Sequence, residues 1–422
     1  MRLRRIGPDE VSRLEREPVD ATTLAAAADI VEQVRTGGES ALRSLAERFG
    51  DRRADEPLVL GPAELAAARA RLPAAHRELL ERTADRIAAF ARVQRDALGD
   101  VDVAVPGGRA GHRVAPVERA GCYAPGGRFP LPSSVLMTAV TAHAAGVSEV
   151  WVASPKPDDV TLAAASVAGA DALLAVGGAQ AIAALAYGAG PVPACDVVVG
   201  PGNRWVTAAK KLVAGRVGID MLAGPSELVV LADSTADPVT VAADLLAQAE
   251  HDPDALPVLV TTDSALADAV DAELARDLET LPTRPTAEAA LGNGFTVVVD
   301  DLEQAIAVCD RLAPEHLQVL TVEADAVAGR LAHWGGLFIG EVSAEVFGDY
   351  GVGPNHTLPT GGVARFKGGL SVLDFLRVRT WLRMEPGDTT EGVARDAAAL
   401  ARLEGLEAHA RAAECRLAHR RG

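Results

Sequence analysis

The pattern of apolar and polar side chains changes near residue 114 of this chain. Before that point, apolar residues recur every three or four positions, as at Leu80, Ala84, Ile87 and Ala91. This spacing places them on one face of an α-helix. The first hundred residues are therefore predicted to be mainly helical.

From Val114 onward, short apolar runs alternate with alanine-rich stretches of helical character. Each run is apolar on both faces, which is typical of strands in a parallel sheet that helices cover on both sides. The runs lie at 150–152, 172–176, 197–199, 228–231, 258–261 and 297–299. Their number predicts an α/β protein with two Rossmann-like, doubly wound domains.

The segment after about Gly369 contains no further run that reads as a strand. Residues 372–422 are predicted to be mostly helical, with alanine and leucine recurring from Ala397 to Arg411. So short a segment cannot bury a core of its own. We expect it to dock on another domain or on another subunit.

Composition narrows the class of protein. The chain has 422 residues, too many for one ordinary core, and 49% of them are hydrophobic. No apolar run reaches the ~20 residues that a membrane span needs, and the basic first residues are not followed by the apolar stretch of a signal peptide. Four widely spaced cysteines and a net charge of −17 favour a cytoplasmic protein that binds neither nucleic acid nor membranes.

Gln248 and His251 form a candidate metal-binding pair. They are three residues apart at the predicted end of a helix, which Asp252-Pro253 terminates, so they share one face. An imidazole nitrogen and an amide oxygen on one face supply half of a metal site. A lone motif of this kind also matches solvated helix ends by chance, so its meaning depends on the residues that join it.

Further polar segments carry candidate acid/base chemistry. Glu315 and His316 are adjacent and can act as two separate acid/base groups in one cleft, although a solvated loop pair has the same sequence. The glycine-rich segment 348–362 contains Asp349 and His356. Loops of this length are usually functional or disordered, and its polar composition favours a site.

Two glycine-rich turns follow predicted strands, at Gly177-Gly178-Ala179-Gln180 and at Gly200-Pro201-Gly202-Asn203. Both place small residues and free backbone N–H groups at predicted helix N-termini, where a phosphate can approach. Turns of this composition also occur for purely steric reasons.

Eight sequence blocks taken together resemble the histidinol dehydrogenase family, and they occur in that family's order. The blocks are GCYAPGG (121–127), GGAQAIAALAYG (177–188), GPGN (200–203), DMLAGPSE (220–227), QAEHDP (248–253), APEHL (313–317), GDYGVGPNHTLPTGG (348–362) and EGLEAH (404–409). They span most of the chain beyond Val114. The first twenty residues match poorly.

The resemblance implies discontinuous domains in a homodimer. It assigns residues 1–18 to an N-terminal helical segment, and 19–122 with 226–370 to a larger Rossmann-like domain that carries the metal and the catalytic residues. Residues 123–225 would form an inserted Rossmann-like domain that binds NAD. Residues 371–422 would form a helical tail exchanged with the partner subunit.

The resemblance also implies one zinc ion per subunit, with Gln248, His251, Asp349 and His409 as ligands. Two imidazoles, a carboxylate and an amide oxygen suit zinc and leave positions open for a substrate nitrogen. Manganese or cobalt would fit the same ligands, so the ligands alone do not identify the metal.

The implied reaction is the oxidation of L-histidinol through an aldehyde to L-histidine, with reduction of two NAD. His316 matches the family's base for the alcohol step, and Glu315 matches the group that activates water for the aldehyde step. The matching NAD-binding residues are Tyr123, Gln180 and Asn203. The matching substrate-binding residues are Ser226, Gln248, His251, His316, Asp349, His356, Glu404 and His409.

Three alternatives share some of these features. A relative in the same superfamily would oxidise another diol, such as a sulfonated propanediol, but Glu404 carries the charge that the ammonium group of histidinol needs. A two-domain binding protein would have no use for the Glu315–His316 pair beside a metal set. A metal-dependent hydrolase would release its product without forming NADH.

Overall fold

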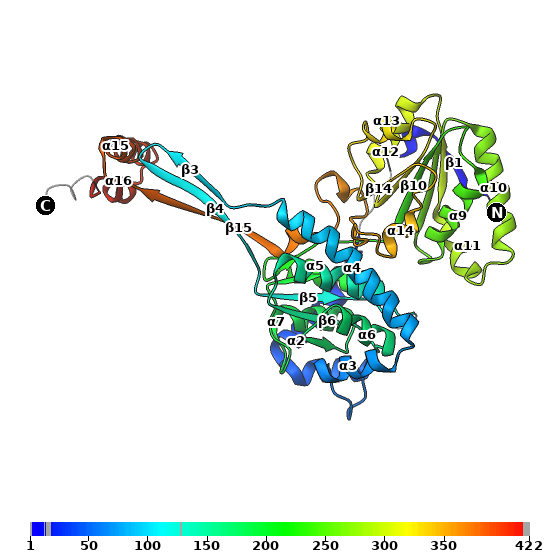
Figure 1. The fold of residues 1–422 in the computed structure, drawn as a ribbon, viewed down its shortest axis with the longest axis horizontal. Helices are drawn as coiled ribbons and strands as arrows, with labels where there is room; N and C mark the ends of the chain where they lie inside the picture. The colour runs from blue at the N-terminus through cyan, green and yellow to red at the C-terminus, as the bar shows by residue number, and fades with distance from the viewer. Residues whose placement is uncertain (1, 12, 14–17, 127–128, 417–422) are drawn as a thin grey trace. The chain divides into compact units, whose positions relative to one another are not determined.

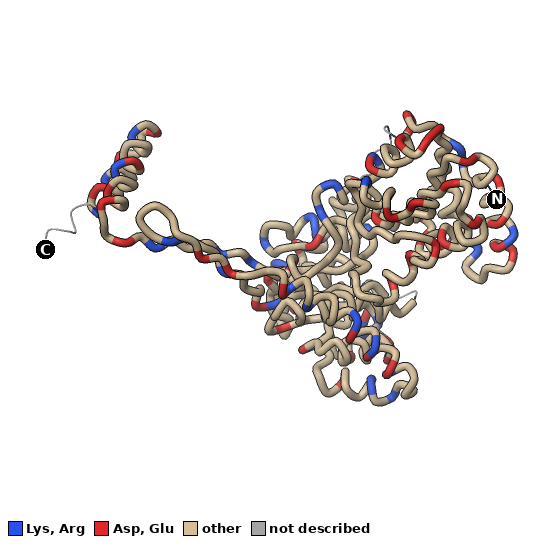
Figure 2. The backbone as a smooth tube through the Cα atoms, turned by 45° about the horizontal axis from the view of Figure 1, so that its top comes forward, with Lys and Arg blue, Asp and Glu red and all other residues tan. Residues whose placement is uncertain are grey.

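The computed structural model describes residues 2–11, 13, 18–126 and 129–416. The chain divides into two compact units, the first comprising Met1–Gln94 with Val117–Phe375 and the second Arg95–Pro116 with Leu376–Gly422. Figure 2 shows acidic and basic residues interspersed along both units. Among the described residues, no helix is both long enough and apolar enough to cross a membrane.

The first unit contains two six-stranded sheets, and one of them is parallel throughout (Figure 1). Its strand order is β1-β12-β11-β10-β13-β14. The strands are β1 (Arg4–Ile6), β10 (Glu227–Ala232), β11 (Leu256–Thr261), β12 (Phe295–Val298), β13 (His316–Leu320) and β14 (Gly336–Ile339). From β10 onward the order corresponds to the 3-2-1-4-5 arrangement of a doubly wound fold.

Helices cover both faces of this sheet because successive side chains of a strand point to opposite faces. Leu228 and Val230 of β10 pack into one core with α9, α10 and α11. Val229 and Leu231 pack into the opposite core with α1, α12 and α13. The helices are α1 (Pro8–Val11), α9 (Pro238–Ala249), α10 (Ser264–Leu278), α11 (Arg284–Asn293), α12 (Leu302–Leu312) and α13 (Ala324–Ala328).

The second sheet of the first unit has the order β2-β7-β6-β5-β8-β9. All its pairs are parallel except β2 with β7. Its strands are β2 (Val59–Leu60), β5 (Arg119–Tyr123), β6 (Glu149–Ala153), β7 (Ala172–Leu174), β8 (Val197–Val199) and β9 (Gly218–Ile219). From β5 onward the order repeats the doubly wound arrangement of the first sheet, so the predicted α/β fold class with two Rossmann-like sheets is confirmed.

Two of the N-terminal helices, α2 (Ala21–Arg48) and α3 (Pro62–Arg71), pack with helices of this second sheet, and α4 (Ala74–Asp96) follows them along the chain. The later helices of this region are α5 (Pro132–Ala145), α6 (Asp159–Val167), α7 (Gly178–Tyr187) and α8 (Arg204–Val213). Residues of α2, α7 and α8 share one apolar core, and α3 packs against α6. This differs from the expected division, in which 19–122 joined the larger domain, because the apolar face of α2 is buried on α7 and α8.

The N-terminal segment 1–18, expected to be helical, includes among its described residues both the helix α1 (Pro8–Val11) and a strand. Arg4–Ile6 forms the edge strand β1 and pairs in parallel with β12. The carboxylate of Asp271, on α10, accepts the backbone N–H of Leu3 at 3.0 Å and an Arg5 guanidinium N–H at 2.7 Å. So short a strand shows no periodicity in the sequence, and the sequence does not reveal that its hydrogen-bond partners come from a distant segment.

The second unit is a three-stranded antiparallel sheet of β3 (Val101–Val105), β4 (Gly108–Pro116) and β15 (Leu376–Met384), followed by α15 (Asp388–Leu403) and α16 (Glu407–Glu414). The tail expected at 371–422 to be helical therefore begins with the 3₁₀ turn Val372–Phe375 and a nine-residue strand. The alternation of Arg377, Arg379 and Arg383 with Val378 and Leu382 is the period-two signal for this strand.

Candidate active site

The catalytic candidates lie at the amino ends of two neighbouring strands. β10 and β13 pair in parallel with Leu228 opposite His316, so Ser226 and Glu315, which directly precede the strands, meet beside Glu227, the first residue of β10. In doubly wound folds, ligands usually bind at the carboxyl ends of the strands. The first sheet therefore uses the opposite edge for this cluster.

The backbone holds His316 in one tautomer. His316 is buried, and its Nδ1 lies 2.9 Å from the carbonyl oxygen of Glu227. A carbonyl oxygen only accepts hydrogen bonds, so Nδ1 carries the hydrogen and Nε2 keeps its lone pair. Nε2 is therefore the atom of His316 that can take a proton from a substrate.

The Glu315 carboxylate is held by two donors beside His316. Its Oε2 accepts the Ser226 hydroxyl at 2.6 Å and the backbone N–H of Glu227 at 2.8 Å, and it lies 3.6 Å from His316 Nδ1. Burial raises the pKa of Glu315 well above its usual value, although the two hydrogen bonds act in the opposite direction. A carboxylate of raised pKa is a stronger base, as water activation requires.

Glu345 is a site residue that the sequence analysis missed. It lies on α14 (Glu345–Asp349), one helical turn before Asp349. Its Oε1 is 3.3 Å from His316 Nε2, and Asp349 Oδ1 is 3.9 Å from the same nitrogen. Burial raises the pKa of Glu345 to about 7, and the His316 charge acts against this rise. The i, i+4 spacing of the two acidic residues was the signal available in the sequence.

The metal-ligand candidates of the first unit fit a metal. Gln248 is fully buried, and its amide nitrogen and oxygen have no hydrogen-bond partner among the described residues. Buried polar atoms are nearly always paired, so this amide is arranged for a ligand from outside the chain. His251 Nε2 lies 3.4 Å from Asp349 Oδ2, which brings an imidazole and a carboxylate together.

The helix carrying Gln248 ends slightly earlier than predicted. α9 stops at Ala249, with Glu250 as its C-cap, and His251 follows in a turn. The His251 N–H still donates to the Gln248 carbonyl at 3.4 Å. The pair therefore stays on one turn, although His251 lies outside the regular helix. The ligand atoms of His316, Glu345 and Asp349 also lie within 4.8 Å of one another.

His356 reaches this cluster from the glycine-rich segment. Its Nδ1 lies 3.1 Å from the backbone carbonyl of Asp349 and donates to it, and its Nε2 lies 3.3 Å from the Ser134 hydroxyl on α5. Burial lowers the pKa of His356. Because Ser134 follows β5 of the second sheet, this contact connects the two sheets beside the candidate site.

The first glycine-rich turn has fewer free amides than expected. The N–H of Gly177 donates to the Asp51 carboxylate at 3.0 Å, and the N–H of Gly178 donates to the Tyr123 hydroxyl at 3.1 Å. Gln180 Nε2 donates to the same Asp51 oxygen at 3.2 Å. The expectation of free N–H groups for a phosphate is wrong for these two amides, because residues distant in sequence take them.

The second turn is held in a similar way. The Asp220 carboxylate accepts the N–H of Gly200 at 2.7 Å and pairs with the buried Lys210, whose ammonium donates to the Gly200 carbonyl at 2.9 Å. The Asn203 side-chain oxygen caps α8 by accepting the N–H groups of Trp205 and Val206. This cap uses the side-chain oxygen of Asn203 and not its amide nitrogen.

Glu404 and His409 lie in the second unit. Glu404 is the C-cap of α15, and Gly405, with φ of +76°, turns the chain into α16, which carries His409. Arg402 fixes this corner by bonding to Glu407 and Glu414. In the sequence block 121–127, Gly127 lies outside the described residues.

Known proteins resemble this chain over nearly its whole length. The family model for histidinol dehydrogenase matches residues 14–417. The histidinol dehydrogenase of Thermus thermophilus is 51% identical over 341 residues, which are 81% of this chain and 82% of that protein. The chain belongs to the histidinol dehydrogenase family.

Two further members of the family support this assignment. The histidinol dehydrogenase of Aromatoleum aromaticum is 45% identical over 406 residues, covering 94% of this chain and 92% of that protein. The crystal structure of histidinol dehydrogenase from Elizabethkingia anophelis has a TM-score of 0.91 at 31% identity and covers 98% of both chains. The resemblance stated from the sequence blocks is confirmed, and the chain is an oxidoreductase.

The raised pKa of Glu315 predicts a pH-dependent gain of stability in Glu315→Gln. A carboxyl whose pKa is higher in the folded state stabilises the fold below its unfolded pKa, and loses this contribution as the pH rises through the folded pKa. In metal-free protein, we expect the variant to match the unsubstituted protein at pH 4.5. At pH 8 its Tm should be higher by on the order of 2–4 °C.

Thermal unfolding followed by circular dichroism at the two pH values measures this difference. The exposed Glu341 provides the matched control, since Glu341→Gln removes a solvated charge. A Tm difference for Glu315→Gln that is equal at both pH values would contradict a buried carboxyl of raised pKa.

Proposed function

We propose that this protein oxidises L-histidinol to L-histidine with NAD, at a zinc site that the partner subunit of a homodimer completes. The observation that carries this proposal is the orientation of His316. Its Nδ1–H is held by the Glu227 backbone carbonyl, and its Nε2 lies 3.3 Å from the buried carboxylate of Glu345. The water-activating candidate Glu315 lies on the other side of the ring, 3.6 Å from Nδ1. The names of the family members support the substrate.

In the alcohol step, His316 Nε2 accepts the proton of the substrate hydroxyl. The electron pair of the O–H bond forms the carbonyl, while hydride leaves the carbinol carbon for the nicotinamide ring of NAD. The Glu227 carbonyl stabilises the resulting imidazolium through the Nδ1–H bond at 2.9 Å.

In the aldehyde step, Glu315 takes a proton from water as the water oxygen adds to the carbonyl carbon, and the imidazolium of His316 returns its proton to the carbonyl oxygen. Neutral His316 then accepts a hydroxyl proton of this hydrate as the second hydride leaves for a second molecule of NAD, which yields the carboxylic acid. Ser226 orients Glu315 by donating to its Oε2 at 2.6 Å. One base and one water-activating group therefore serve both oxidations.

The zinc ligands in this proposal are Gln248, His251, Asp349 and His409. The first three belong to the first unit, and the unpaired amide of Gln248 supports their assignment. When bound, the ion would hold the imidazole and amine nitrogens of histidinol and so orient the alcohol. Manganese and cobalt accept the same donors.

The proposed NAD site lies at the carboxyl ends of the strands of the second sheet. Tyr123 ends β5, Gln180 lies in the first turn of α7 and Asn203 caps α8. The strands β5 and β8 flank the point where the strand order reverses, and such points bind dinucleotides in doubly wound folds. This placement supports the three residues as cofactor contacts.

Exchange of the tail in a homodimer would explain the apolar surface of the second unit. Among the described residues of α15 and α16, only Ala398 and Ala410 are buried. Large apolar side chains of the unit are exposed, namely Val101, Val103, Val378, Leu382, Leu400, Leu403 and Leu406. A surface of this kind usually marks an interface.

In the proposed homodimer, the tail supplies Glu404 and His409 to the partner's site. Ser226 and His356 are further proposed substrate contacts. The described cysteines form no disulfide bond with one another, which is consistent with the cytoplasmic location that we propose.

Glu404 favours histidinol over a sulfonated propanediol. The carboxylate attracts the substrate ammonium of histidinol and repels a sulfonate. Oxidation of another diol is the second candidate function, and the assay below separates it from the first.

With L-histidinol and excess NAD, purified protein should form two NADH for each L-histidine. The reason is that Glu315 and His316 provide for both steps in one site. Absorbance of NADH and chromatographic quantification of histidine give the ratio, with propanediol sulfonate as the competing substrate. One NADH with release of the aldehyde would refute the two-step assignment, and a preference for the sulfonate would favour the second candidate.

His251→Ala should lose bound zinc, because it removes one of the two proposed imidazole ligands. We expect a loss of zinc affinity of at least about tenfold, by comparison with weaker outer-sphere substitutions. Elemental analysis after dialysis measures the zinc content. The control is His76→Ala, at an exposed histidine of α4, which should retain zinc, and full retention in His251→Ala would count against the site.

Mixing Glu404→Ala with His316→Ala subunits should restore part of the activity if tails are exchanged. Each heterodimer then contains one site in which both Glu404 and His316 are present, up to about half of the sites in a dimer. Heterodimers are isolated with two affinity tags and assayed for NADH formation. No recovery in verified heterodimers would indicate that each site is built from one chain.

A further inference from the structure

The start of α7 is held together by one carboxylate from a distant loop. Asp51 follows the C-terminus of α2, and its Oδ2 accepts both the Gly177 backbone N–H at 3.0 Å and the Gln180 side-chain N–H at 3.2 Å. Asp51 itself is fixed, since its own N–H donates to the Ala46 carbonyl at 2.8 Å. The carboxylate thus bridges the backbone of the turn and the side chain of Gln180.

This bridge determines which way the Gln180 amide points. A carboxylate only accepts hydrogen bonds, so the Gln180 NH₂ group faces Asp51, and the reversed amide would place two acceptors against each other. Gln180 is 3% exposed, which leaves the amide little freedom to reorient. The opposite atom, Oε1, lies over the turn, where a Cβ added at Gly178 would be 3.0 Å away from it.

The geometry of the turn requires glycine at both of its first positions. A Cβ at Gly177 would lie 2.6 Å from the Pro155 side chain, and Gly178 has a φ of +64° that favours glycine. The Gly178 N–H is already taken by the Tyr123 hydroxyl. Asp51 is therefore the group on which the orientation of Gln180 depends.

We propose that Asp51 is a positioning residue for the cofactor: it turns the Gln180 amide so that Oε1 accepts a hydrogen bond from an N–H or O–H group of NAD. This inference rests on the proposed NAD contact at Gln180. The Asp51 carboxylate also occupies the Gly177 N–H, where a phosphate would otherwise bind. Asp51 therefore acts on cofactor affinity and takes no part in the transfer of protons or hydride.

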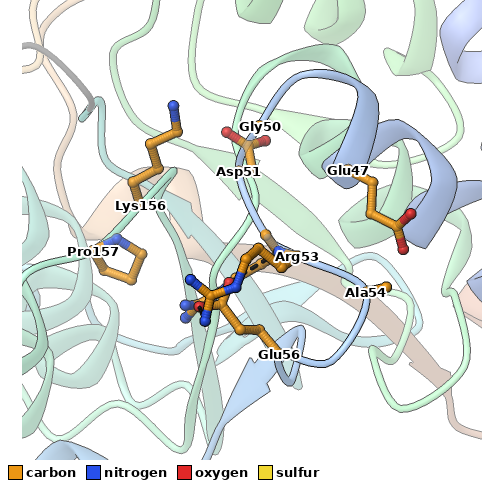
Figure 3. Close-up of a pocket in the computed structure, with 9 residues that line it drawn as sticks. Glu47, Gly50, Asp51, Arg53, Ala54, Glu56, Lys156 and Pro157 are labelled. Carbon is orange, nitrogen blue, oxygen red and sulfur yellow. Dashed lines mark hydrogen bonds and ion pairs between the residues drawn. The ribbon is translucent and has the colours of Figure 1, made fainter.

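Asp51 can be shortened without opening the apolar core. It lines a cavity of about 590 Å³, together with Lys156, Pro157, Arg52 and Arg53. Figure 3 shows Lys156 beside the loop that carries Gly50 and Asp51. Because one side of Asp51 borders this polar space, water can replace its side chain, and the Asp51→Ala variant is expected to fold. Asp51→Ser is the substitute if Asp51→Ala is not recovered.

A double-mutant cycle on the KM for NAD tests the proposal. Asp51→Ala and Gln180→Ala should each raise this KM by about tenfold, the effect of one hydrogen bond to a charged or well-placed group. The double variant should match Gln180→Ala, because Asp51 acts through Gln180. The kcat and the KM for histidinol should change less than about twofold, a split that general loss of structure would not produce.

Two further variants complete the test. Asp51→Asn keeps an acceptor oxygen and should restore the KM for NAD to within about threefold. Lys156→Ala, which lines the same cavity, should leave it unchanged. An unchanged KM in Asp51→Ala, or effects that multiply in the double variant, would overturn the role of Asp51. An unchanged KM in Gln180→Ala would instead refute the NAD contact at Gln180, and the inference with it.

Discussion

The hydrogen bond from His316 Nδ1 to the Glu227 carbonyl is the contact on which the candidate site depends. It assigns the hydrogen to Nδ1, and it leaves Nε2 as the basic atom among the carboxylates of Glu345 and Asp349. The bond exists because β10 and β13 are neighbouring parallel strands. The register of one strand pair therefore determines the tautomer of the catalytic candidate.

The same strand pair explains the unusual location of the site. Glu315 and Ser226 precede the strands, so the acid/base cluster lies at the amino edge of the first sheet, while the turns of the second sheet that carry Gln180 and Asn203 lie at its carboxyl edge. The contact of His356 with Ser134 connects the two sheets. From β10 and from β5 onward the two sheets share one strand order, but they contribute different edges to these two groups of residues.

Carboxylates also organise the glycine-rich turns. Asp51 takes the first amide of one turn and Asp220 the first amide of the other, although both come from other segments of the chain. Glycine spacing alone indicated helix N-termini with free N–H groups, because the sequence of a turn does not reveal which distant side chain reaches it. In both turns the protein supplies its own anion, beside Gln180 in one turn and Asn203 in the other.

From the sequence alone, apolar runs and helical spacing determined the α/β class and two sheets, and the eight ordered blocks determined the family and the candidate residues. Those signals are local, and side-chain periodicity is set by the backbone of each element. Only the tertiary structure decided that α2 packs with α7 and α8 and that residues 4–6 form an edge strand. It also decided that Glu345 lies beside His316 and that Asp51 accepts a hydrogen bond from Gln180. Such contacts join residues tens to hundreds of positions apart, and the free energy that selects them comes from packing and hydrogen bonding across the fold.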